Sequence, residues 1–219
     1  MYRQAKTIAS NETPARVRLN CLALLATLTA LIAWFIMGSP CVAQPDAKMP
    51  KSEASDPVYV ESGIAGVVLQ NSDSGQQFIE THGLGTMSDD GLMHNFYENA
   101  SGSEILDLIQ HPGSNRHSFS EAVFFRPDCF PLGAVPIKSK RFVSSRGVKL
   151  GLGASDVRRM LGRPHEVKTR KSGKVTYKYT CDNPATCPSL AKYNVPTYTA
   201  VAEFANGRLV KYSFGYDYP

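Results

Sequence analysis

Two glycines, Gly151 and Gly153, lie in the stretch GVKLGLGASDVRRMLGRP (residues 147–164), where a glycine-rich loop could bind a phosphate. Such a loop needs a Lys-Ser/Thr pair or the full GxGxxG spacing, so that backbone N–H groups converge on the anion. Here Ala, Ser and Asp follow Gly153, and the carboxylate of Asp156 would repel a phosphate at a helix N-terminus. We therefore interpret the two glycines as a structural turn.

Other residue types that support catalysis or metal binding are scattered along the chain. No Gly-x-Ser-x-Gly motif marks a nucleophilic serine. His111 and His117 flank a turn-like HPGSN segment, where exposed turn residues are favoured over an acid–base or metal-binding role. The five histidines have no zinc-ligand spacing. The sequence thus predicts no enzyme activity, no metal, no cofactor and no small-molecule substrate, and an unrecognised hydrolase is a minor alternative.

Cys181 and Cys187 bracket the turn-rich segment DNPAT, which could bring their Cα atoms to disulfide distance. Disulfides form in the oxidising compartments that exported proteins enter, so we predict a Cys181–Cys187 bridge. Cys129 has no partner at a similar spacing and is expected to be buried or free.

Residues 1–43 have the pattern of an export signal. A basic N-terminal region precedes an uncharged apolar run at 21–37, and small residues follow it. We predict cleavage after Ala43 and a periplasmic or envelope-associated protein. An uncleaved inner-membrane anchor through 21–37 is an alternative, and lipidation at Cys41 is a third, although Pro40 is unsuitable for it. Residues 44–57 lack an apolar period and predict a flexible linker.

Charge divides the remaining chain into an acidic and a basic half. Residues 44–137 carry 4 basic and 13 acidic side chains, whereas residues 138–219 carry 16 basic and 5 acidic ones. Either the two halves face each other or the basic half faces an anionic partner such as a membrane surface. Export disfavours nucleic acid as that partner.

The basic half predicts a short helix followed by a three-stranded antiparallel meander. Ala154 to Leu161 forms the helix, with Val157, Met160 and Leu161 on one apolar face and Asp156 in the first turn. Gly162 and Pro164 end it. Residues 175–181 alternate as a strand, and Asn206-Gly207 predicts a tight hairpin between two further strands. The prolines of 182–196 predict a loop there.

Residues 66–85 share the form of residues 147–164, because both have Gly-Val-x-Leu, a polar turn and a short helical run closed by glycine. Strand-like runs at 92–98, 104–110 and 121–126 follow. We predict an α+β fold of two tandem units, residues 58–137 and 138–219, each a short helix on a three- to four-stranded antiparallel sheet. The units could share one core or stack their sheets edge to edge.

The basic half also concentrates tyrosines, which we interpret mainly as core residues. An exposed fraction beside lysines would suit a protein interface. The residues that we expect to contact a partner are Arg158, Arg159, Lys174, Lys178, Tyr198 and Lys211.

Residues 147–214 resemble the SmpA/OmlA (BamE-like) family of exported domains. That family has a Gly-x-Ser/Thr-x-x-x-Val-x-x-x-x-Gly-x-Pro motif, then an aromatic strand and a Phe-x-Asn/Asp-Gly-x-Leu hairpin. The matching residues are Gly151, Gly153, Val157, Gly162, Pro164, Tyr177, Tyr179, Phe204, Asn206, Gly207 and Leu209. The doubling is also similar to the β-lactamase-inhibitor-protein fold.

This resemblance implies a non-enzymatic envelope domain that binds another protein, with a role in outer-membrane or envelope protein assembly. The chain departs from the family in its poor lipidation signal, its cysteine-bracketed loop and its doubling. A secreted inhibitor that holds a target enzyme is the alternative function.

Overall fold

The computed structural model describes residues 56–85, 92–127 and 134–217. The predicted leader, nearly all of the linker and Cys129 lie outside these residues. The described elements are β1 (Gly63–Ile64), β2 (Val67–Val68), α1 (Ser72–His82), β3 (Met93–Glu98), β4 (Ile105–Gln110), β5 (Glu121–Phe125), β6 (Val135–Pro136), α2 (Ala154–Leu161), β7 (Glu166–Thr169), β8 (Val175–Cys181), α3 (Pro188–Tyr193), β9 (Thr197–Ala205) and β10 (Arg208–Asp217). None of the described helices has the length and apolar character needed to cross a membrane.

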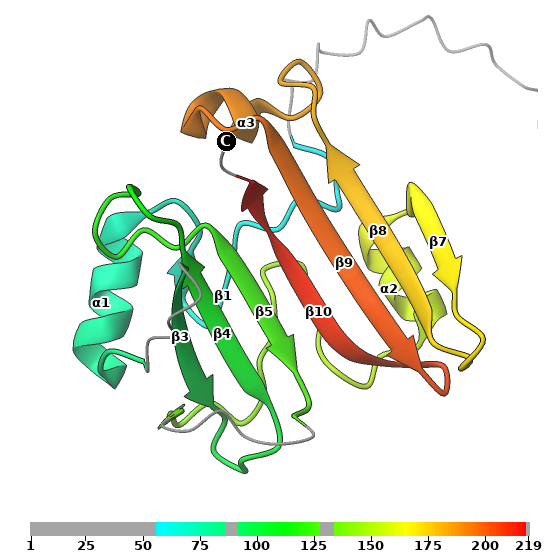
Figure 1. Cartoon of the computed structure of the whole chain (residues 1–219), viewed down its shortest axis with the longest axis horizontal. Helices are drawn as coiled ribbons and strands as arrows, with labels where there is room; N and C mark the ends of the chain where they lie inside the picture. Colours follow the sequence, from blue (N-terminus) through cyan, green and yellow to red (C-terminus); the bar gives the residue numbers. More distant parts are fainter. Residues whose placement is uncertain (1–55, 86–91, 128–133, 218–219) are drawn as a thin grey trace, which may run out of the picture. The chain divides into compact units, whose positions relative to one another are not determined.

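Eight of these strands form one sheet in the order β6-β3-β4-β5-β10-β9-β8-β7 (Figure 1). Neighbours are antiparallel except β3 and β6, which are parallel. Strands from the acidic and basic halves meet where β5 pairs with β10, from Lys211 opposite Phe125 to Gly215 opposite Glu121. The predicted α+β class is confirmed.

The predicted separation into two units is not evident in the described residues, because both halves contribute to a single sheet and a single hydrophobic cluster. Pairing between β5 and β10 explains this, since it satisfies the backbone N–H and C=O groups that each half would otherwise expose at an edge. The strands of both halves thus lie in one eight-stranded sheet over one core.

The β9–β10 hairpin forms at the predicted Asn206-Gly207 turn. Both residues have positive φ, 50° and 71°, which is the requirement of a type I′ turn. Side chains of β9 alternate strictly between buried and half-buried positions.

Two elements of the basic half were missed from sequence. β7 adds a fourth strand to the predicted meander, and it has only four residues, all of them exposed, which is too short a run for a strand prediction from sequence. α3 lies inside the predicted 182–196 loop, begins at Pro188 and has only six residues. A helix that short shows less than two turns of apolar periodicity.

α2 forms as predicted. Val157 and Leu161 are fully buried, and the partly buried Met160 packs against the same cluster. Asp156 accepts a hydrogen bond from the Gly153 backbone N–H at 3.3 Å, which satisfies a free donor at the helix start.

Gly151 and Gly162 of the 147–164 stretch serve backbone turns. Gly151 and Gly162 have φ of +85° and +80°, a conformation that glycine adopts at low cost. The Gly162 N–H closes α2 on the Arg158 carbonyl at 2.9 Å, and the buried Pro164 follows. The structural interpretation therefore agrees with the backbone geometry at Gly151, whereas Gly153 has a φ of −72°, which any residue can adopt, and precedes α2 as its N-cap.

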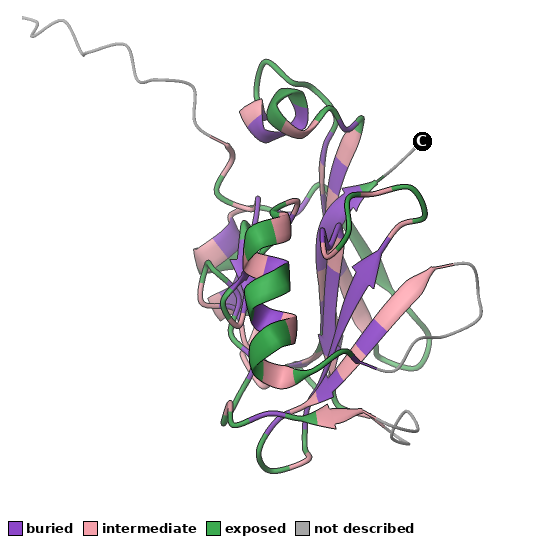
Figure 2. Cartoon of the chain, turned by 90° about the vertical axis from the view of Figure 1, so that its left-hand side faces the viewer, coloured by how far each residue is buried: buried purple, intermediate pink, exposed green. Residues whose placement is uncertain are grey.

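The core lies on one face of the sheet. Phe78 of α1 and Val157 of α2 join one cluster with inward-facing strand residues such as Leu106, Phe124 and Tyr212. Figure 2 shows α1 with exposed residues on its outward side and buried residues along the strands behind it. Each helix thus buries a narrow apolar stripe against the sheet.

Residues 56–62, which we call the strap, cross this core and are fixed by a buried carboxylate. Glu61 is fully buried and accepts hydrogen bonds from the hydroxyls of Ser144 and Ser145 at 2.7 Å and from the Arg146 N–H at 2.8 Å. Tyr212 of β10 donates a fourth hydrogen bond at 3.2 Å. Burial raises the pKa of Glu61, while these donors oppose the rise.

Val157→Asp should unfold the described domain or destabilise it by at least about 3 kcal/mol, because it places an unpaired charge in the core. Ser155→Asp is the matched control, since Ser155 is exposed in the first turn of the same helix, where a carboxylate is favourable. Urea unfolding of both variants measures the difference. Tolerance of Val157→Asp would show that α2 does not pack as described.

Glu61 should make stability depend on pH. Its raised pKa means that the folded protein holds the proton more tightly than the unfolded chain, whose Glu has the ordinary value of 4.5. The stabilisation is therefore complete below pH 4.5 and is lost as pH rises through the raised pKa.

Urea unfolding of the wild type and of Glu61→Gln, from below pH 4.5 to neutral pH, measures how much Glu61 contributes to the free energy of unfolding, because glutamine does not titrate. We expect the wild type to lose stability relative to the variant as pH rises. A difference between the two proteins that does not change with pH would contradict the assignment.

Candidate functional site

Residues 158–178 carry eight basic side chains and a single acidic one, Glu166. We call the surface that these cations form the basic surface. Seven of the eight are exposed and Lys178 is half-buried. The members are Arg158, Arg159, Arg163, Lys168, Arg170, Lys171, Lys174 and Lys178.

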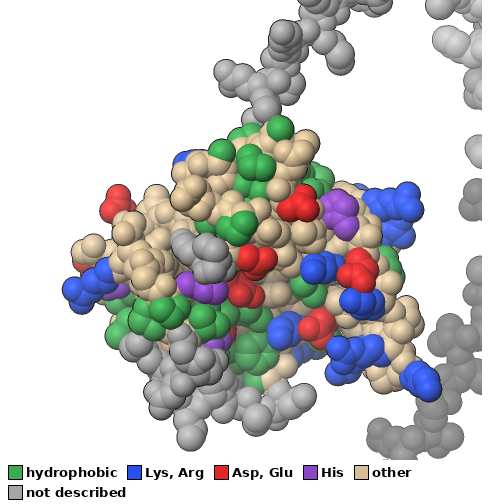
Figure 3. Space-filling view, turned by 45° about the horizontal axis from the view of Figure 1, so that its top comes forward, with side chains coloured by type: hydrophobic (Ala, Val, Ile, Leu, Met, Phe, Trp, Pro, Cys, Tyr) green, Lys and Arg blue, Asp and Glu red, His purple; other side chains and the backbone are tan. Residues whose placement is uncertain are grey.

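Secondary structure explains why these cations face solvent. The apolar face of α2 is buried, which leaves Arg158 and Arg159 on its outer side. β7 and β8 form an antiparallel hairpin whose connecting residues, 170–174, are all exposed. Figure 3 shows Lys and Arg side chains gathered on one side of the molecule, with acidic side chains among them.

Two of the eight cations form ion pairs within the described part of the chain. Arg159 lies 2.8 Å from Asp156, and Lys168 lies 2.8 Å from Glu166. The hydrogen bond from Lys168 lowers the pKa of Glu166. Both pairs are solvent-exposed and therefore weak, so most of the positive charge on the basic surface remains available to a partner.

Four of the six predicted contact residues, Arg158, Arg159, Lys174 and Lys178, belong to the basic surface. Lys211 is exposed on β10, opposite Glu203 of β9, and is separated from β8 by that strand. The charge count of the segment could have identified Arg163, Lys168, Arg170 and Lys171 as well, but the contact prediction did not include them.

Tyr198 was predicted wrongly as a surface contact. It is fully buried, its hydroxyl accepts from the Glu61 N–H at 2.8 Å, and it donates to the Tyr59 carbonyl at 3.2 Å. Tyr198 shares its side of β9 with the buried Ala200, Ala202 and Phe204, and this parity could have indicated its position.

His94 and Asp107 form a partly buried pair that sequence analysis missed. The imidazole Nδ1 lies 2.6 Å from the carboxylate, and the two residues come from the neighbouring strands β3 and β4. These strands lie toward the other end of the sheet from the basic surface. Among the described residues, no cluster of three His, Cys, Asp or Glu side chains could hold a metal ion.

Cys181 and Cys187 are both buried thiols in this structure. Burial raises the pKa of the Cys187 thiol to about 12, and a hydrogen bond with the Cys181 thiol adds to the rise. The two sulfur atoms are thus neighbours on either side of the predicted turn, and the bridge stays a prediction.

Oxidised protein from an exporting cell should resist alkylation at both cysteines when it is unfolded in urea without reductant, because the sulfur atoms are bridged. Urea is needed because burial alone would protect the thiols of the folded protein. Mass spectrometry after alkylation, with a reduced sample as control, measures this. Alkylation of both residues without reductant would rule out the bridge.

Comparison with known proteins gives no family. No protein-family model matches the sequence, and no curated protein matches it. Among solved structures, the crystal structure of YjgB, a DUF4309 family protein from Bacillus subtilis, is similar with a TM-score of 0.39 and 12% identity, covering 70% of this chain and 84% of that chain. A likeness this distant assigns no function, and the resemblance to the SmpA/OmlA family stays a prediction.

Proposed function

We propose that this protein is an exported, non-enzymatic binding protein of the bacterial cell envelope that contacts an acidic protein through its basic surface. The observation that carries the proposal is the density of exposed cations, eight in residues 158–178 against one carboxylate. Such a surface attracts an anionic partner over a distance of about one Debye length, roughly 8 Å at physiological salt.

The edge strand β7 supports a protein as the partner. Among the described strands, β7 ends the sheet and has a neighbour on only one side, so backbone groups on its other side are open to hydrogen bonding within that part of the chain. Val167, in the middle of β7, is 55% exposed and offers an apolar contact among the cations. An acidic extended segment could pair with this edge, with its carboxylates near Lys168 and Arg170.

Envelope assembly is the more specific role that we propose, and it depends on the resemblance of residues 147–214 to SmpA/OmlA domains. Internal duplication is part of the same proposal. It is supported by the order of elements, since α1 precedes β3, β4 and β5, and α2 precedes β7 to β10. A secreted inhibitor is the second candidate, favoured by the polar outer face of β8 to β10, which carries Lys178, Glu203 and Lys211.

Charge reversal should separate partner binding from folding. We expect Lys171→Glu/Lys174→Glu to reduce recovery of the partner at least tenfold in a crosslinking pull-down from envelope extract at low salt, because it changes the charge of the basic surface by four. Lys138→Glu/Lys140→Glu is the matched control, since both lysines are exposed outside the basic surface.

Three outcomes would overturn the proposal. These are equal recovery by both double variants, loss of stability in the Lys171/Lys174 variant, or binding to anionic lipid vesicles with no crosslinked protein. Fractionation distinguishes the two candidate functions, because an envelope scaffold is retained with the membranes and an inhibitor is released into the medium.

A further inference from the structure

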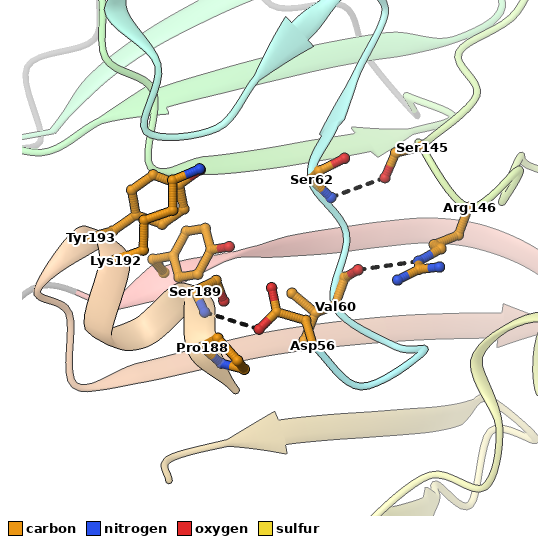
Figure 4. A pocket seen from close by; sticks show the side chains of 10 residues that line it. Asp56, Val60, Ser62, Ser145, Arg146, Pro188, Ser189, Lys192 and Tyr193 are labelled. Atoms are coloured by element: carbon orange, nitrogen blue, oxygen red, sulfur yellow. Dashed lines mark hydrogen bonds between the residues drawn. The ribbon is translucent and has the colours of Figure 1, made fainter. Parts of the chain in front are cut away.

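A cavity of about 600 Å³ opens between α3, the strap and the loop that follows Ser144. This volume lies within the range of small-molecule sites. The lining residues are Asp56, Val60, Ser62, Ser145, Arg146, Pro188, Ser189, Lys192, Tyr193 and Tyr216. Figure 4 shows Lys192 and Tyr193 of α3 on one side, Arg146 on the other, and Asp56 and Val60 between them.

Most polar groups of this cavity already have partners within the protein. The Asp56 carboxylate accepts from the Ser189 N–H at 2.9 Å, and the Ser145 hydroxyl lies between the Ser62 N–H at 2.9 Å and Glu61 at 2.7 Å. These contacts hold the wall in place because they connect α3, the strap and the 144–146 loop. They leave little hydrogen-bonding capacity for a neutral polar ligand.

The two cations differ from the other polar groups. Arg146 uses only its Nε, which donates to the Val60 carbonyl at 3.3 Å, and Lys192 lies over the Tyr193 ring at 4.8 Å. Neither is among the ion pairs between described residues. Both side chains are exposed and line the cavity, so the Arg146 terminal nitrogens and the Lys192 ammonium are available there as charged donors.

We propose that this cavity binds a small organic dicarboxylate, with one carboxylate at Arg146 and the other at Lys192. The two cations on opposite sides suit a ligand with two anionic groups, and the side chains of Val60, Pro188 and Tyr193 provide apolar contacts for the carbon chain between them. Asp56 weakens binding through like-charge repulsion, and its hydrogen bond to Ser189 keeps it in the wall.

Equilibrium dialysis of the full chain against radiolabelled linear dicarboxylates, from succinate to pimelate, tests the site. Hexanoate is the matched ligand with one carboxylate. We expect at least one dicarboxylate to bind saturably below about 10 mM and about tenfold more tightly than hexanoate, since a second ion pair is made. Absence of saturable binding, or equal affinity for hexanoate, would overturn the proposal.

Three variants locate the ligand. Arg146→Gln and Lys192→Gln should each lower dicarboxylate affinity to that of hexanoate, and Asp56→Asn should raise it, because asparagine keeps the acceptor oxygen for Ser189. Lys174→Gln, on the basic surface, is the control and should change nothing.

Lys192 is exposed, and we expect Lys192→Gln to fold normally. This variant therefore tests the site even if Arg146→Gln destabilises the 144–146 loop. Unchanged affinity in Lys192→Gln would contradict the site. An equal loss in Lys174→Gln would also contradict it, because that result indicates nonspecific attraction to the basic half.

Discussion

The hydrogen-bonded carboxylate of Glu61 is the interaction on which the arrangement of this protein most depends. It has no exposed surface, and its four donors come from the 144–146 loop and from β10. Its backbone N–H is bound by Tyr198 of β9. One residue near the start of the described chain thus connects the strap to strands more than 130 residues away in sequence. An unsatisfied carboxylate in this position would be costly, so the donors and the acceptor must be placed together.

The pairing of β5 with β10 determines where the charged residues of the two halves lie relative to each other. It places an acidic half and a basic half in one sheet, with the charge-rich hairpin β7–β8 at one end and the His94–Asp107 pair toward the other. Cations of residues 158–178 stay on the surface because the core takes only the opposite face of α2 and of the strands. The strap and α3 border the cavity next to the Glu61 network, so the same contacts that fix the strap also shape the walls of the cavity.

Much of the fold was accessible from local sequence patterns. Alternation located β8, strand-like runs located β3, β4 and β5, and the Asn206-Gly207 pair located the β9–β10 hairpin, because these signals depend on backbone geometry within a few residues. The patterns failed where an element has no buried face or is too short, as in β7 and α3. Among the residues expected to contact a partner, Arg158, Arg159, Lys174 and Lys211 are exposed and Lys178 is half-buried. Tyr198 is buried, and its position was hard to predict because a tyrosine suits a core and an interface equally well.

The sequence by itself determined the α+β class, the end points of α2, the turn that joins β9 to β10 and the concentration of basic residues in 158–178. Each depends on neighbouring residues: glycine at positive φ, apolar spacing along one helix face, or a simple charge count. Only the tertiary structure decided that β5 pairs with β10, that Glu61 is buried beneath Ser144 and Ser145, and that Arg146 and Lys192 border one cavity. These contacts join residues 46 or more positions apart, and no local pattern encodes which distant backbone or side chain will satisfy a buried polar group.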